Sequence, residues 1–229
     1  MLMEKQFERT TLLIGEEQVQ KLQSKSVIVF GVGGVGGYCV EALVRSGIEN
    51  IAIVDADVVD ETNLNRQIIS LRSNLGLPKV EVMKKRIMDI NINARVTCFN
   101  MFYDKKTDND IDLTTYDYVV DCIDSVKSKL LLINKAYEAK VPIISAMGAG
   151  NKLNPSGFIV SDISKTEYDP LAKKIRLELR KNNISHLKVV YSKEQPIKNP
   201  NSDTIGSIAY VVGSAGFLIA SEVIKDLIA

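Results

Sequence analysis

Gly31-Val32-Gly33-Gly34-Val35-Gly36 follows the apolar run Ser26–Phe30 and precedes a helix-like segment, residues 36–46. An apolar run that ends in glycine is typical of a parallel strand buried on both faces. Glycine suits the turn because it adopts left-handed backbone angles and brings N–H groups close to phosphate. Asp55 ends the next strand-like run, at the distance expected for a carboxylate that binds ribose hydroxyls. The pattern predicts a nucleotide site that uses Gly31, Gly33, Gly34, Gly36 and Asp55.

Strand-like and helix-like segments alternate from about residue 24. The strand-like segments are 26–31, 50–55, 95–100, 118–123 and 142–145, and the helix-like segments are 36–46, 78–91 and 126–140. This alternation predicts an α/β, Rossmann-like parallel sheet with right-handed crossovers and a ligand site at the carboxyl ends of its strands.

The pattern changes after residue 150. We expect a small extension made of strands at 158–161 and 189–192, a basic helix at 170–181 and a loop at 192–204. The chain therefore divides into a helical segment (1–23), a nucleotide-binding core (24–150) and a substrate- and dimer-forming part of the same domain (151–229).

The 229 residues are 45% hydrophobic and 25% charged, a composition typical of a globular protein. The cysteines Cys39, Cys98 and Cys122 form no C-x-x-C pair, which excludes a zinc ribbon and a redox dithiol. The N-terminus does not resemble a secretion signal, so a cytoplasmic location is expected. The uncharged stretch 204–221 contains several glycines, which favours a buried helix at a dimer contact over a membrane-associated one.

Polar residues after the second strand change the expected ligand from a redox cofactor to ATP. Asn63, Arg66 and Gln67 share one face of a helical turn, and Lys79 opens the next helix. A nicotinamide enzyme reads its pyrophosphate largely through backbone amides, whereas an enzyme that attacks the α-phosphate of ATP must neutralise a triphosphate. These residues therefore favour ATP over NAD.

Asp124 follows another strand, where α/β sheets place their ligands. Its carboxylate is a candidate ligand for Mg²⁺ that bridges phosphate oxygens. The alternative is that Asp124 caps the helix at 126–140.

The motifs G-V-G-G-V-G, V-D-A-D, N-L-N-R-Q, G-L-P-K and D-C-I-D resemble the ubiquitin-activating-type adenylating superfamily over residues 9–150. The resemblance implies that Asp55 contacts ribose and Asp57 the nucleotide region, and that Asp124 binds Mg²⁺. Phosphates would be held by Asn63, Arg66, Gln67 and Lys79. Arg9 resembles the family's N-terminal arginine, which reaches the nucleotide of a neighbouring subunit and implies a homodimer.

Within the superfamily, the segment S-D-I-S-K-T-E-Y-D-P-L-A-K-K-I-R at 161–176 resembles the branch of tRNA threonylcarbamoyladenosine dehydratases. The alternative branch activates the C-terminus of a ubiquitin-like sulfur-carrier protein and typically carries two zinc-binding C-x-x-C pairs. No cysteine follows Cys122 in this chain, which leaves neither zinc ligands nor a thiol for sulfur relay. The resemblance implies ATP-dependent cyclisation of the modified adenosine, with a monovalent cation left open. A nucleotide-binding scaffold without activity is a further alternative.

This chemistry needs no enzyme base for its first step, because the substrate's own carboxylate is ionised at neutral pH. For tRNA binding, the candidates are Lys173, Arg176 and Arg180, which fall on one face of the basic helix. The alternative is that they form an ordinary solvated surface.

Overall fold

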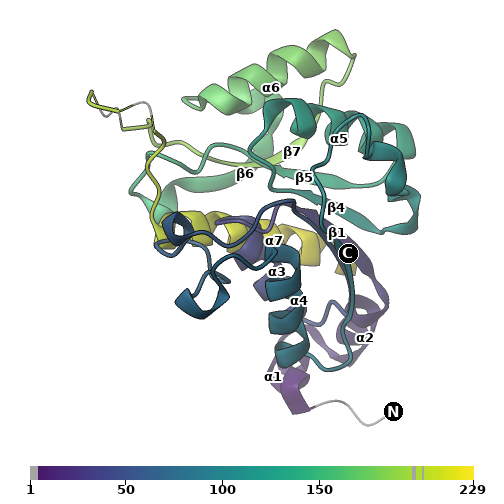
Figure 1. The fold of residues 1–229 in the computed structure, drawn as a ribbon. Coiled ribbons are helices and arrows are strands. Elements are labelled where there is room, and N and C mark those ends of the chain that lie inside the picture. Colours follow the sequence, from purple (N-terminus) through teal and green to yellow (C-terminus); the bar gives the residue numbers. More distant parts are fainter. Residues whose placement is uncertain (1–4, 198–199, 203) are drawn as a thin grey trace.

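The structure is a computed structural model that describes residues 5–197, 200–202 and 204–229. Seven strands form one sheet in the order β3-β2-β1-β4-β5-β7-β6, and helices cover both faces (Figure 1). Neighbouring strands pair in parallel except β6 and β7, which are antiparallel. The strands are β1 (Ser26–Phe30), β2 (Asn50–Val54), β3 (Arg95–Phe99), β4 (Tyr118–Asp121), β5 (Ile143–Ala146), β6 (Phe158–Asp162) and β7 (Lys188–Ser192). The Rossmann-like α/β prediction is confirmed.

The helices form two layers. Buried side chains of α2 (Glu16–Ser24), α3 (Gly36–Arg45), α4 (Lys79–Ile90) and α7 (Ala209–Ile228) share one core with one face of the sheet. Those of α5 (Val126–Ala139) and α6 (Pro170–Lys181) share a second core with the other face. The remaining helix is α1 (Glu8–Ile14), and short 3₁₀ turns lie at Lys5–Phe7, Glu61–Asn63, Arg72–Asn74, Asp108–Asp110, Leu113–Thr115, Pro155–Gly157 and Ile163–Lys165.

The central strands are buried on both faces, as their apolar sequences predict. In β1, Val27, Ile28, Val29 and Phe30 are inaccessible to solvent, and Val27 pairs with Ile51 of β2 and Tyr118 of β4. β1 and β4 are neighbours in the sheet, and the strand order runs outward from them in both directions. In doubly wound sheets ligands bind at this point, beyond the carboxyl ends of the strands.

The C-terminal extension does not stand apart from the core. β7 pairs with β5, β6 completes the edge of the same sheet, and α7 packs against α3. The expected N-terminal helical segment is divided into α1 and α2 by Gly15, whose φ is 88°. Residues 1–4 of that segment, and residues 198–199 and 203 of the expected loop, lie outside the described residues.

The uncharged stretch 204–221 is only partly helical, since α7 begins at Ala209. Its glycines serve packing within the chain: a Cβ on Gly216 would lie 2.4 Å from the carbonyl oxygen of Val35, and one on Gly213 would touch the Tyr38 ring. None of the helices in the described part of the chain is long and apolar enough to cross a membrane.

Candidate active site

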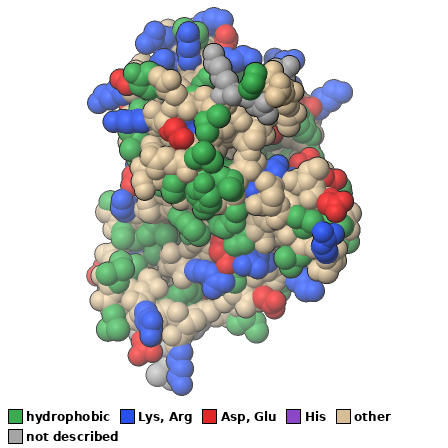
Figure 2. Space-filling model, turned by 90° about the vertical axis from the view of Figure 1, so that its left-hand side faces the viewer, with side chains coloured by type: hydrophobic (Ala, Val, Ile, Leu, Met, Phe, Trp, Pro, Cys, Tyr) green, Lys and Arg blue, Asp and Glu red, His purple; other side chains and the backbone are tan. Residues whose placement is uncertain are grey.

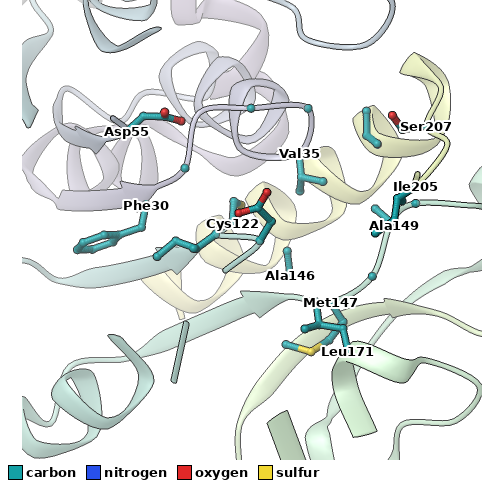
Figure 3. Close-up of a pocket in the computed structure, with 18 of the residues that line it drawn as sticks. Phe30, Val35, Asp55, Cys122, Ala146, Met147, Ala149, Leu171, Ile205 and Ser207 are labelled. Atoms are coloured by element: carbon teal, nitrogen blue, oxygen red, sulfur yellow. The ribbon is translucent and has the colours of Figure 1, made fainter. Parts of the chain in front are cut away.

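A pocket of about 750 Å³ opens at the carboxyl ends of the central strands. Figure 3 shows Asp55 and Phe30 on one side of this pocket and Ile205 and Ser207 on the opposite side. The structure brings ten of the predicted site residues together in its wall: Gly31, Gly33, Gly34, Asp55, Asp57, Asn63, Arg66, Gln67, Lys79 and Asp124. Residues that are far apart in the chain thus meet where the strand order predicts a ligand.

The glycine turn differs in detail from the prediction. Of its four predicted glycines, only Gly31 has a left-handed φ, of 85°. Two of the others serve close approach: a Cβ on Gly36 would lie 1.8 Å from the carbonyl oxygen of Gly31, and one on Gly34 would lie 3.2 Å from the Val212 side chain. A Cβ on Gly33 would make only an ordinary contact, at 3.6 Å from the Gln67 side chain. Gly36 is buried behind the turn, so it shapes the pocket without lining it.

Two backbone N–H groups, one of them in the glycine turn, hold the Asp55 carboxylate in place. One carboxylate oxygen accepts a hydrogen bond from the backbone N–H of Val32 at 2.8 Å, and the other accepts from the N–H of Asp57 at 2.9 Å. Burial raises the pKa of Asp55, although these backbone donors and nearby Lys79 act in the opposite direction. Each oxygen has a second lone pair with which it can accept a bond from a ribose hydroxyl.

Lys79 is buried at the start of α4, and its ammonium lies 2.7 Å from the exposed carboxylate of Asp57. The backbone N–H of Lys79 also donates to the carbonyl of Asp57 at 2.9 Å. The sequence predicted both residues at the site but gave no sign that they form an ion pair. The pair places one buried cation at a fixed position in the pocket wall.

Asn63, Arg66 and Gln67 lie on one turn, because the N–H groups of Arg66 and Gln67 both donate to the carbonyl of Asn63. One nitrogen of Arg66, Nη1, donates to the carbonyl of Thr62 at 2.8 Å and to the Asn65 side chain at 2.9 Å. The buried side-chain oxygen of Gln67 has no hydrogen-bond partner in the structure. This oxygen is suited to a donor from a ligand, such as a hydroxyl, whereas phosphate oxygens only accept and would take a bond from the NH2 group of the same side chain.

Asp124 is exposed at the rim of the pocket. The alternative prediction that Asp124 caps α5 is wrong, because Ser125 is the N-cap residue and accepts from Ser128 N at 3.5 Å. The described residues contain no group of three or more metal-ligating side chains. A single carboxylate fits Mg²⁺ that arrives with a nucleotide, because Mg²⁺ usually binds one or two carboxylates together with substrate phosphates.

Beneath the pocket, a buried ion pair ties β4 to α5 and β5. The ammonium of Lys129 donates to Asp121 Oδ2 at 2.8 Å, Ser145 Oγ at 3.2 Å and the carbonyl of Ala146 at 2.9 Å. The other Asp121 oxygen accepts from the N–H of Ile123 at 3.1 Å. All three ammonium hydrogens of Lys129 thus have acceptors, and the network fixes the first residues after β4 and β5, which line the pocket. Sequence reasoning missed it, since nothing marks Lys129 as buried.

The side of the pocket beyond β5 is lined by Met147–Lys152, Asp169–Leu171, Pro196 and Ile205. Asp169 joins two of these segments, since one carboxylate oxygen accepts from Gly148 N and the other caps α6 at Ala172 N, each at 2.9 Å. Burial lowers the pKa of Lys152, against the opposing charges of Asp169 and Glu194. The D-P-L-A sequence could have indicated the cap, but not the bond to Gly148. We call this side the β5 side of the pocket.

Besides Gly36, four predicted functional residues lie outside the pocket wall. Arg9 is exposed on α1, and none of the described residues that line the pocket belongs to α1. On α6, Lys173 and Arg180 are exposed, whereas Arg176 is half-buried and donates to the carbonyls of Ile163 and Thr166. Arg176 therefore already has backbone partners in this structure.

The family model of the ThiF family matches residues 7–229, so this chain is a member of the ThiF family. It is 40% identical to the tRNA threonylcarbamoyladenosine dehydratase of Bacillus subtilis, over 97% of this chain and 94% of that protein. The crystal structure of the Escherichia coli tRNA N6-threonylcarbamoyladenosine dehydratase TcdA in complex with AMP matches with a TM-score of 0.92 and 37% identity, over 97% of this chain and 94% of the other. The ATP complex of that enzyme matches with a TM-score of 0.89 and 36% identity, over 97% and 93% of the two chains.

The similarity to sulfur-carrier activators is shorter. The adenylyltransferase and sulfurtransferase UBA4 of Meyerozyma guilliermondii is 34% identical over 128 residues, which cover 56% of this chain and 30% of that protein. The similarity to the dehydratases covers 97% of this chain and therefore includes β6, α6 and α7. This is the part of the chain in which the two branches of the superfamily were expected to differ.

Proposed function

We propose that this chain uses ATP to adenylate the carboxylate of threonylcarbamoyladenosine in tRNA and then cyclises it, with release of AMP and pyrophosphate. The observation that carries the proposal is the 40% identity to a dehydratase of this specificity over 97% of the chain, which includes the β5 side of the pocket. The ten predicted residues in the pocket wall support the same reaction.

In the proposed complex, Asp55 accepts bonds from the ribose, and the glycine turn presents backbone N–H groups to the phosphates. Asn63, Arg66, Gln67 and Lys79 hold the triphosphate. Two cations are needed because an anionic carboxylate must approach an anionic α-phosphate. Asp124 would hold Mg²⁺, which would neutralise part of the phosphate charge.

The first step joins two bound substrates. A carboxylate oxygen of the threonyl group attacks the α-phosphorus, the bond to the β-phosphate breaks, and pyrophosphate leaves. Arg66 and Lys79 stabilise the charge that develops on the departing oxygens. The product is an acyl-adenylate.

The second step is intramolecular. The carbamoyl group of the same side chain attacks the activated carbonyl carbon, the bond to AMP breaks, and a ring closes with loss of one proton. Because the tether holds the two groups together, the step gains the rate advantage of proximity. One carboxylate oxygen leaves on AMP, so the nucleoside loses one water overall, and no enzyme thiol takes part.

The proposed partners follow from the remaining predicted residues. Lys173 and Arg180, which are exposed on α6, would contact tRNA phosphates, and binding would then weaken as salt is added. A homodimer, in which Arg9 of one subunit reaches the nucleotide of the other, would complete the site. We propose that the protein works in the cytoplasm, where its tRNA substrate is found.

The test is turnover of the modified tRNA by the purified chain with ATP and Mg²⁺. The modified nucleoside should become lighter by about one water, with AMP formed only when the modification is present. Unmodified tRNA is the control. A nucleoside of unchanged mass would overturn the proposal, and AMP formation with a carrier protein instead would favour the sulfur-carrier alternative.

A further inference from the structure

Tyr168 is an exposed aromatic residue beside the β5 side of the pocket. Its side chain is 58% exposed, and it directly precedes Asp169, Pro170 and Leu171, which line the pocket. Single exposed apolar residues are ordinary on protein surfaces, so what distinguishes Tyr168 is its place beside the pocket together with its backbone conformation.

The backbone of Tyr168 is in a conformation that bulky residues rarely adopt. Only four non-glycine residues in the described part of the chain have a positive φ: Lys140, Asn151, Tyr168 and Asn183. Asparagine tolerates this region, and Lys140 ends α5 as its C-cap. The φ of 54° at Tyr168 has neither explanation. Such strain persists only where the surroundings enforce it, and it is often found at functional sites.

Hydrogen bonds on both sides of Tyr168 enforce this conformation. Before it, Arg176 donates to the carbonyls of Ile163 and Thr166 and to the Thr166 hydroxyl. After it, Asp169 bonds the N–H groups of Gly148 and Ala172. Arg176, which the sequence offered as a phosphate contact, thus holds the turn that presents Tyr168.

Exposed lysines lie on both sides of Tyr168 in the chain, together with the exposed Glu167 directly before it. Lys165 precedes it on the turn and Lys173 and Lys174 follow it on α6, all with exposed side chains. Figure 2 shows Lys and Arg side chains gathered at the upper end of the molecule, the end at which Figure 1 places α6. Exposed aromatic rings among cations are the means by which proteins bind unpaired bases of RNA.

We infer that the ring of Tyr168 stacks on an unpaired base of the tRNA loop that carries the modified adenosine. This inference rests on the proposed function and adds a residue that selects RNA over the free nucleoside. The turn held by Arg176 and Asp169 restrains the backbone of Tyr168 before RNA binds, so little backbone entropy is lost on binding. Arg176 and Asp169 act as positioning residues for this contact.

The test compares Tyr168→Asn, which keeps tolerance of the left-handed backbone and removes the ring, with Tyr168→Phe, which keeps the ring. Affinity for tRNA carrying threonylcarbamoyladenosine is measured without ATP. The asparagine variant should bind about 5- to 150-fold more weakly, the range expected for base–aromatic stacking, and the phenylalanine variant should bind as the unchanged protein does. KM for ATP should not change in either variant.

Salt dependence separates stacking from charge. Tyr168→Asn should leave the slope of log affinity against log salt unchanged, whereas Lys173→Ala with Arg180→Ala should make that slope shallower. Wild-type affinity in Tyr168→Asn, or an equal loss in Tyr168→Phe, would overturn the inference. The unchanged protein's turnover of modified tRNA is measured in parallel, so that failure of the proposed function is seen separately.

Discussion

At the scale of single residues, Arg66 offers the sharpest test of the phosphate site. Arg66→Ala should lower kcat by about 10²- to 10³-fold, comparable to removal of one preorganised donor to a transition state. Arg72→Ala is the matched control, because that side chain is 79% exposed and its nearest carboxylate oxygen, on Glu61, is 3.4 Å away. The measurement is steady-state formation of AMP with modified tRNA. A near-normal rate in Arg66→Ala would mean that the phosphates lie elsewhere.

We expect Lys129 to contribute to the stability of the fold. Lys129→Met would leave the Asp121 carboxylate buried without its cation, which should cost about 3–5 kcal/mol in the free energy of unfolding. Lys181→Met is the control, because its ion pair with Glu178 is exposed and should contribute about 1 kcal/mol or less. Urea unfolding followed by circular dichroism measures both. Equal urea midpoints for the two variants would show that the buried pair of Lys129 and Asp121 contributes no more to stability than the exposed pair does.

At the scale of secondary-structure elements, the packing of α7 against α3 distinguishes two glycines of the same helix. A Cβ on Gly216 would lie 2.4 Å from the Val35 carbonyl oxygen, whereas one on Gly213 would make an ordinary contact of 3.5 Å with Tyr38. Gly216→Ala should therefore destabilise the fold by about 1–3 kcal/mol. Because Val35 belongs to the glycine turn, KM for ATP should also rise.

Gly213→Ala is the matched variant. Alanine is a better helix former than glycine by about 1 kcal/mol, so this change should leave the melting temperature unchanged or raise it. The comparison needs only thermal unfolding and ATP titration of both variants. If Gly216→Ala were as stable as Gly213→Ala, the close approach of α7 to the turn would be refuted.

These elements also show how far the sequence could predict the site. Periodicity located every strand of the sheet, and the glycine turn with Asn63, Arg66, Gln67 and Lys79 was recognisable because local spacing sets which residues share a face. Contacts between segments that are distant in sequence were not predictable: the buried pair of Lys129 and Asp121, and the bond between Asp169 and Gly148, depend on how β4, β5 and α6 pack. The role of Gly216 was unpredictable for the same reason, because it depends on a contact with Val35, which is distant in sequence.

At the scale of the whole molecule, the position of Arg9 yields a test of the proposed homodimer. Arg9→Ala and Arg66→Ala should each be nearly inactive alone, since every site would lack one arginine. A mixed dimer has one site with both arginines. After unfolding and refolding of an equal mixture, about a quarter of wild-type activity should therefore return. An inactive mixture, or an active Arg9→Ala variant, would contradict a site shared between subunits.

The packing of α7 has a consequence for how the protein is made. Val212 lies against Gly34, and Gly216 lies against Val35, so the nucleotide cradle rests on a helix that is translated long after the cradle itself. Chains fold from the N-terminus during synthesis, at about 5–20 residues per second. A ribosome-bound chain that has not yet released residues 209–228 from the exit tunnel lacks this support behind the turn. Binding of ATP should therefore begin only once residues 209–228 have left the tunnel and packed behind the turn.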